Sequence, residues 1–176
     1  SFREFEARSN RLAHLLRATG LQRLDHYAVL MENHPRFLEC CGAGARAGLY
    51  YTCINSYLTA EEVAFIVNDS HSQVLITTLA RREVAIAAAK LCPRLKLCLM
   101  IDGTGDDAPF VDYARAVAAM PSTPLADERL GTAMLYSSGT TGRPKGILRP
   151  LPDTPPSERL PLYDFLLKLW QYREGM

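Results

Sequence analysis

Short apolar runs alternate with helical patterns along most of this chain of 176 residues, and that alternation restricts the folds it can adopt. Five runs have the length and composition of β-strands: residues 27–31, 49–54, 73–78, 95–101 and 132–136. Most of them are continuously apolar, which is typical of strands whose two faces are both covered. The sequence therefore predicts an α/β fold with a mainly parallel sheet between two layers of helices.

Helical periodicity fills the intervals between these runs. Six helices are expected, at residues 1–20, 33–47, 60–68, 81–91, 110–120 and 162–172. Ser1 with Glu4, and Thr59 with Glu62, have the spacing of a capping box, so both residue pairs predict a helix start. Asn33 is expected to cap the second helix, with a proline in its first turn. The small residues at 42–45 predict that this helix packs closely on a neighbour.

The overall charge argues against several classes of partner. The net charge is +1 and the basic residues are scattered, so neither a nucleic-acid surface nor a polybasic membrane patch is expected. No apolar run approaches the roughly 18 residues that a membrane-spanning helix needs. We therefore expect a protein with neither kind of partner and without a transmembrane segment.

The chain has five cysteines, an odd number, and no C-x-x-C motif. A disulfide framework and a cysteine metal site are both disfavoured. We expect free thiols that pack as small apolar residues, which fits a cytoplasmic protein.

Isolated polar residues give weaker signals. The four histidines lie far apart on different predicted elements, and each is interpreted as a surface or loop residue. Asp106 and Asp107 follow the fourth predicted strand, in a segment that also contains glycines, and are expected to lie in a solvated turn. None of these residues is assigned a catalytic or metal-binding role.

The most informative segment is YSSGTTGRPKG at residues 136–146. Its centre consists of hydroxyl-bearing and glycine residues: Ser137, Ser138, Gly139, Thr140, Thr141 and Gly142. Such residues let the backbone N–H groups approach an anion closely, and Lys145 adds a full positive charge. Because the segment follows a predicted parallel strand, it is expected at the carboxyl edge of the sheet, where open α/β folds bind ligands. We interpret it as a loop that holds the phosphates of a nucleotide.

Three better-known motifs do not fit this segment. A Walker A loop needs Gly-Lys-Ser/Thr, but Pro144 precedes Lys145 here. A nucleophile elbow needs a glycine two residues before the serine, where this chain has Leu135 or Tyr136. A dinucleotide fingerprint is excluded because no G-x-G-x-x-G follows the first strand.

The string YSSGTTGRPKG resembles the signature loop of the AMP-forming adenylate superfamily, which includes acyl-CoA synthetases, luciferases and peptide-synthetase adenylation domains. SFREFEARSNRLAHLLRATGL and RAGLYYTCINSYLTAEEVAFIVNDS are similar to that family's early helix and its strand-turn-helix segment. The resemblance covers most of the chain and favours a bacterial-type fatty-acyl-CoA ligase over a peptide-synthetase domain. It implies part of the family's large N-terminal domain.

The resemblance also implies chemistry. The family joins a carboxylic acid to ATP, releases pyrophosphate and transfers the acyl group to coenzyme A. By this correspondence residues 137–142 would wrap the β- and γ-phosphates, Ser137 could touch Mg²⁺, and Lys145 would assist phosphate binding. No catalytic residue is assigned within the chain, because the family's catalytic lysine belongs to a small C-terminal domain that this chain lacks.

The sequence departs from the family pattern at two places. Asn55 is followed by Ser56 where relatives usually have proline, and Arg149 with a proline-rich stretch stands where many have a Thr-His or Ser-His pair. An aryl-CoA ligase or a peptide-synthetase adenylation domain therefore remains an alternative. So does a phosphate-binding or interaction module without ligase activity.

The expected organisation has three parts: an α/β subdomain at 1–149, a proline-rich linker at 150–161 and an amphipathic helix within 162–176. Because family members run to several hundred residues, we expect the chain to be a fragment without ligase activity of its own. We also expect it to form homo-oligomers through exposed apolar faces, including residues 162–170.

Overall fold

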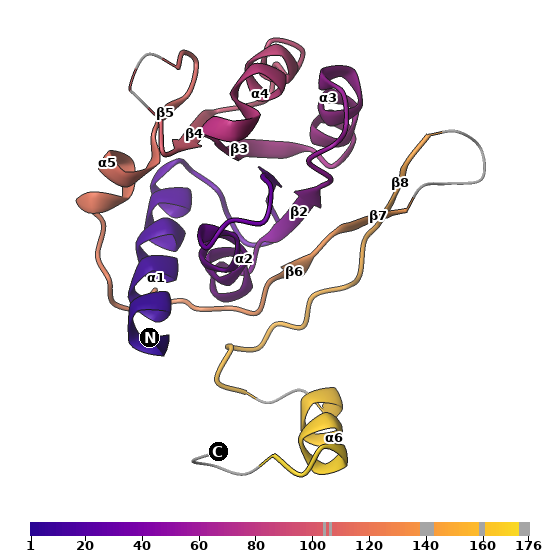
Figure 1. The fold of residues 1–176 in the computed structure, drawn as a ribbon. Helices are drawn as coiled ribbons and strands as arrows, with labels where there is room; N and C mark the ends of the chain where they lie inside the picture. Colours follow the sequence, from indigo (N-terminus) through magenta and orange to yellow (C-terminus); the bar gives the residue numbers. More distant parts are fainter. Residues whose placement is uncertain (104, 106, 138–142, 159–160, 173–176) are drawn as a thin grey trace.

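A six-stranded parallel sheet forms the centre of the structure, a computed structural model that describes residues 1–103, 105, 107–137, 143–158 and 161–172. The strand order is β5-β4-β3-β1-β2-β6 (Figure 1). The strands are β1 His26–Leu30, β2 Tyr50–Ile54, β3 Ser72–Thr78, β4 Leu97–Ile101, β5 Val111–Asp112 and β6 Thr132–Ala133. Every neighbouring pair is parallel, which confirms the predicted kind of sheet.

Helices cover both faces of this sheet, so the predicted three layers are confirmed (Figure 1). One face carries α1 Phe2–Ala18, α2 Arg36–Ala47 and α5 Tyr113–Ala118, and the other carries α3 Ala60–Asp69 and α4 Arg82–Ala89, which follows a 3₁₀ turn at Leu79–Arg81. Successive side chains of β1 point to opposite layers: Tyr27 and Val29 join the α1–α2 core, whereas Ala28 and Leu30 join the α3–α4 core. A strand buried on both faces reads as a continuous apolar run.

The predicted N-terminal caps are confirmed for two helices, α1 and α3, and wrong for α2. Both capping boxes form, at Ser1 with Glu4 and at Thr59 with Glu62. The prediction that Asn33 caps α2 is wrong. The N-cap position is Pro35, whose φ of −55° already fits a helix, and it makes no side-chain capping bond.

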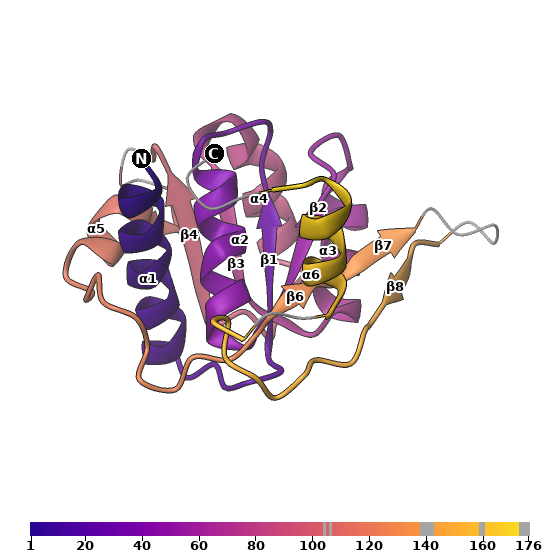
Figure 2. The same cartoon turned by 90° about the horizontal axis from the view of Figure 1, so that it is seen from below.

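The fifth predicted strand, at 132–136, is not a single strand. Thr132 and Ala133 form β6 at the sheet edge, and the chain then leaves the sheet as β7 Leu135–Ser137. β7 pairs antiparallel with β8 Lys145–Ile147 in a separate two-stranded sheet. Figure 2 shows this β7–β8 hairpin extending away from the three-layer body.

A glycine fixes the path into this hairpin. The Gly131 N–H donates to the Ala45 carbonyl oxygen, and a Cβ atom at Gly131 would lie 2.0 Å from the carbonyl oxygen of Gly44. Only glycine lets the backbone pass so close to the end of α2.

The proline-rich stretch that follows β8 lies against the body. The Tyr50 hydroxyl donates to the Arg149 carbonyl oxygen at 2.6 Å, and the Leu130 N–H donates to the Thr154 carbonyl oxygen at 2.9 Å. The last helix, α6 Pro161–Leu169, comes after this stretch and lies below the three-layer body in Figure 1. None of the helices in the described ranges combines the length and the apolar character that a membrane span requires.

Candidate functional site

The β7–β8 hairpin holds the two ends of the predicted phosphate loop side by side. Ser137 is the last residue of β7, Lys145 is the first residue of β8, and the two are cross-strand partners. Both side chains are exposed, and no described residue forms an ion pair with Lys145. Ser138, Gly139, Thr140, Thr141 and Gly142 lie outside the described residues. The structure thus brings together the two described site residues that the sequence singled out.

Two contacts from α3 fix the hairpin relative to the sheet. The Tyr136 hydroxyl donates to Asp69 Oδ2 at 2.6 Å. Burial, and then the adjoining Asp69 carboxylate, raise the pKa of Tyr136, so the phenol keeps the proton that it donates. The Arg143 guanidinium lies over the Phe65 ring, 5.6 Å from its centroid. These contacts determine where the loop starts and ends.

A cavity of about 330 Å³ lies between the hairpin, the carboxyl end of β2 and α3. It is lined by Cys53, Ile54, Asn55, Leu58, Ile66, Tyr136, Ser137 and Pro144. Its volume is at the lower end of the range for small-molecule sites. The cavity lies at the carboxyl edge of the parallel sheet, where the sequence predicted that the loop would start. The strand before the loop, β7, belongs to the separate hairpin and not to the parallel sheet.

The turn after β2 forms with Ser56 at the position where the resemblance had led us to expect proline. The Asn55 side-chain oxygen accepts a hydrogen bond from the Tyr57 N–H at 3.0 Å. This contact closes an Asx turn that needs no proline. The Asx turn thus holds this wall of the cavity with Ser56 in the expected proline's place.

Asp69 and Phe65 were not predicted from the sequence as parts of this site. Asp69 is the last residue of α3, 67 positions before Tyr136, and Phe65 is one of several apolar residues on that helix. Only a signal linking these positions to the hairpin could have identified them, and a single sequence contains none.

The histidines make contacts that support the fold. His34 Nε2 lies 3.1 Å from Asp102 Oδ2, His14 Nε2 lies 3.0 Å from the Thr123 carbonyl oxygen, and His26 stacks on Tyr50. No described residues gather into a group of three His, Cys, Asp or Glu side chains that could hold a metal ion.

The expectation of a solvated turn is wrong for Asp107. Its side chain is buried and forms an ion pair with Arg82 from the start of α4. A buried carboxylate needs such a partner because desolvation would otherwise make its charge costly. Asp106 lies outside the described residues.

All five cysteines are free thiols. Cys40, Cys92 and Cys98 are buried in the two cores, which confirms the expected apolar packing for these three. Burial raises the pKa of both Cys92 and Cys98 to about 11, so neither is a reactive thiolate at neutral pH.

Comparison with known proteins identifies the relatives of this fold and site. Residues 1–150 match the sequence profile of a family described as AMP-binding enzymes. Crotonobetaine/carnitine–CoA ligase of Citrobacter koseri is 29% identical over 164 residues, a match that covers 84% of this chain and 30% of that protein. The chain therefore spans less than a third of the length of this curated relative.

Solved structures agree with the sequence comparison. A Rhodopseudomonas palustris protein, provisionally assigned as a long-chain-fatty-acid CoA ligase, matches with a TM-score of 0.78 and 25% identity over 99% of this chain and 42% of its own. A Mycobacterium tuberculosis fatty acyl CoA synthetase matches with a TM-score of 0.69 and 28% identity over 85% of this chain and 28% of its own.

Proposed function

Because the chain belongs to the family of AMP-binding enzymes, we propose that it is part of an ATP-dependent ligase that joins a carboxylic acid to coenzyme A. In this proposal a carboxylate oxygen attacks the α-phosphorus of ATP, the bond to pyrophosphate breaks, and an acyl-adenylate forms. The thiol of coenzyme A then attacks the acyl carbon, and AMP leaves. The similarity to the Citrobacter ligase and to the Mycobacterium fatty acyl CoA synthetase supports this reaction, with a fatty acid as the proposed substrate.

The observation that carries this proposal is the pairing of Ser137 with Lys145 across the β7–β8 hairpin. An ammonium group and a hydroxyl at the two ends of a Gly/Ser/Thr segment suit the triphosphate of ATP, because charge builds up on the phosphates as pyrophosphate leaves. We assign Lys145 to the phosphates and residues 137–142 to the loop that encloses them.

Mg²⁺ is proposed as the companion of ATP. The Ser137 hydroxyl is an exposed, hard oxygen donor at the end of β7, and it fits an ion whose other ligands are phosphate oxygens and water. The bound ion would supply positive charge to the phosphate chain.

The remaining assignments concern the chain as a whole. We propose that residues 1–149 form the nucleotide-binding unit, that 150–161 link it to the segment 162–176, which contains most of α6, and that the catalytic groups lie outside the chain. ATP–pyrophosphate exchange by these 176 residues alone is accordingly expected to stay at background. Five free cysteines also support a reducing compartment, and we propose the cytoplasm.

Equilibrium binding of ATP and of AMP, each with Mg²⁺, tests this proposal by isothermal titration calorimetry. Lys145→Ala is expected to weaken ATP binding about tenfold, since it removes a charge-assisted contact, and to leave AMP binding nearly unchanged. Lys90→Ala, an exposed lysine at the end of α4, is the matched control. Equal ATP affinity in parent and Lys145→Ala would overturn the assignment of the loop. Binding of inorganic phosphate in preference to ATP would favour the phosphate-binding module instead.

A further inference from the structure

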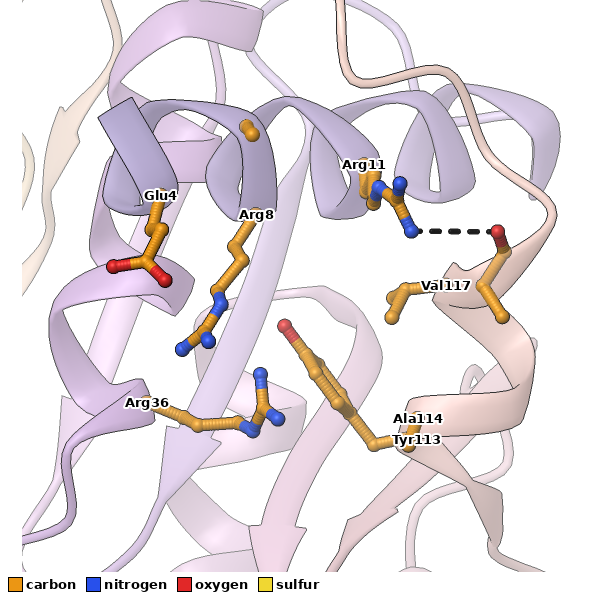
Figure 3. A pocket seen from close by; sticks show the side chains of 9 residues that line it. Glu4, Arg8, Arg11, Arg36, Tyr113, Ala114 and Val117 are labelled. Carbon is orange, nitrogen blue, oxygen red and sulfur yellow. Dashed lines mark hydrogen bonds between the residues drawn. The ribbon is translucent and has the colours of Figure 1, made fainter. Parts of the chain in front are cut away.

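A second cavity, of about 410 Å³, lies between α1, the first turn of α2, and α5 (Figure 3). Its lining combines arginines with small apolar residues: Glu4, Ala7, Arg8, Arg11, Arg36, Tyr113, Ala114, Val117 and Ala118. In Figure 2 the helices α1 and α5 lie at one end of the sheet and the β7–β8 hairpin lies at the other. This α1–α5 cavity is therefore separate from the proposed ATP site.

The charged groups of the α1–α5 cavity are unbalanced. Arg8 and Arg36 both donate to the buried carboxylate of Glu39, at 3.0 and 2.8 Å. Within the described part of the chain, Arg11 makes one hydrogen bond, a long one of 3.4 Å to the Ala118 carbonyl oxygen. Glu39 itself does not line the cavity; Glu4 does, and its carboxylate accepts from the Ser1 ammonium at 2.8 Å. Among the described residues, three guanidinium groups thus line the cavity beside the single carboxylate of Glu4, and Figure 3 shows nitrogen atoms of Arg8 and Arg36 pointing at the cavity.

Tyr113 provides an independent sign of a missing partner. Its side chain is only 1% exposed, and its ring packs under the Arg36 guanidinium, 5.4 Å from the carbon at the centre of that group. No described residue offers the Tyr113 hydroxyl a hydrogen-bond partner. Figure 3 shows this hydroxyl pointing into the cavity between Arg8 and Arg11. A buried hydroxyl without a partner is unfavourable, and a ligand acceptor would satisfy it.

Burial raises the pKa of Tyr113, so its hydroxyl is a proton donor throughout the physiological range. The Tyr113 hydroxyl and three guanidinium groups together present more donors than a carboxylate, with two oxygens, can use. A phosphate group has three terminal oxygens and up to two negative charges. Ala7, Ala114 and Val117 form an apolar wall beside these donors, which suits a small organic body attached to the phosphate.

We propose that the α1–α5 cavity binds a small phosphate monoester, held by the Tyr113 hydroxyl and the guanidinium groups of Arg8, Arg11 and Arg36. The organic part of the ligand contacts the apolar wall. This site is independent of the ATP loop and of the proposed ligase reaction.

Phenyl phosphate is the probe, titrated calorimetrically into the 176-residue chain with benzoate as the carboxylate comparison. Tyr113→Phe removes only the hydroxyl and is expected to weaken phenyl phosphate binding about tenfold, because a hydrogen bond to a charged group is lost. Arg11→Gln is expected to weaken it at least about fivefold. Arg115→Gln, an exposed arginine on α5 that does not line the cavity, is the matched control and should bind as the parent does.

Thermal unfolding of each variant checks that it is folded before titration. Tyr113→Phe is expected to unfold at or above the parent's temperature, because it removes a buried hydroxyl that has no partner. A Lys145→Ala chain should bind phenyl phosphate as the parent does, which separates this site from the ATP loop.

Equal affinities in the parent, Tyr113→Phe and Arg11→Gln would overturn the proposal, as would a loss in Arg115→Gln as large as that in Arg11→Gln. Tighter binding of benzoate than of phenyl phosphate would reject the phosphate monoester as the ligand class. A loss of phenyl phosphate binding in Lys145→Ala would place the probe at the loop and also contradict the proposal.

Discussion

His26 begins β1 half-buried, with its ring stacked on Tyr50 at a centroid distance of 4.8 Å. Its Nδ1 atom is buried without a hydrogen-bond partner among the described residues. Burial lowers the pKa of His26, and the neighbouring His71 lowers it further. His26 is therefore protonated less readily in the folded protein than in the unfolded chain, where histidine has a pKa of about 6.5.

This pKa shift predicts a pH-dependent stability. Below about pH 6.5 the unfolded state binds the additional proton, so the free energy of unfolding should decrease as the pH falls through the lowered pKa of folded His26. The free energy of unfolding should be fully restored above about pH 6.5, the ordinary pKa of histidine. Urea unfolding between pH 5 and 7.5 measures the effect. His26→Phe keeps an aromatic ring beside Tyr50 and should show a shallower pH dependence. Parallel curves for parent and variant would show that His26 is not responsible.

At the scale of elements, α2 approaches the sheet at its small residues, as the sequence predicted. A Cβ atom on Gly44 would lie 2.5 Å from the Tyr27 hydroxyl and 2.7 Å from Cδ1 of Tyr51. The Tyr27 hydroxyl also accepts a hydrogen bond from the Gly44 N–H at 3.0 Å and donates to the Cys40 carbonyl oxygen. Because Gly44 has no side chain, the buried Tyr27 ring can pack directly against the backbone of α2.

Gly44→Ala tests this packing by the sign of its effect. Helix propensity alone would stabilise the variant by up to about 1 kcal/mol. The clash with Tyr27 and Tyr51 should instead destabilise it by about 1–3 kcal/mol, because a packed interface yields little. The midpoint of urea unfolding decides between the two. A more stable variant would mean that α2 can move away from β1 at little cost.

The β7–β8 hairpin is the element that sequence patterning described least well. Residues 132–136 form an apolar run that fits one strand, yet the chain changes partner within it. β6 pairs with β2, whereas β7 pairs with a strand that begins eight residues after β7 ends. The strand with which each segment pairs depends on which sheet edge is free once the sheet has assembled. The local sequence of the segment does not indicate this.

At the scale of the whole molecule, α6 exposes a set of large apolar side chains. Phe165 and Leu169 are each 59% exposed, and Trp170, just after the helix, is 62% exposed. Exposed apolar side chains grouped on one short segment favour association with another apolar surface. Self-association through residues 162–170 remains a prediction of the sequence.

Light scattering coupled to size-exclusion chromatography tests this prediction over a range of protein concentrations. The parent's average mass should rise with concentration, and Leu169→Glu should shift it towards that of the monomer. Gln171→Glu adds the same charge at an exposed position beside the helix and should leave the mass as in the parent. A monomeric parent at the highest concentration would reject the prediction.

The sequence alone determined those features whose signals lie within a few residues of one another. Both capping boxes, at Ser1 with Glu4 and at Thr59 with Glu62, are local patterns, and both form. The doubly buried strands follow from continuous apolar runs. The phosphate-loop string at 136–146 is also local, and the resemblance drawn from its eleven adjacent residues agrees with the family match over residues 1–150.

Only the tertiary structure decided which distant residues meet. Asp107 is buried because Arg82, 25 positions earlier, supplies its counter-charge. The hairpin is placed by Tyr136 meeting Asp69, and the α1–α5 cavity by Tyr113 reaching the arginines of the first two helices. Such partners are set by how the layers pack, and packing depends on the whole chain at once. Local sequence patterns therefore predicted most helices, strands and the loop segment. Which side chains are buried, and which distant residues contact one another, is seen only in the folded structure.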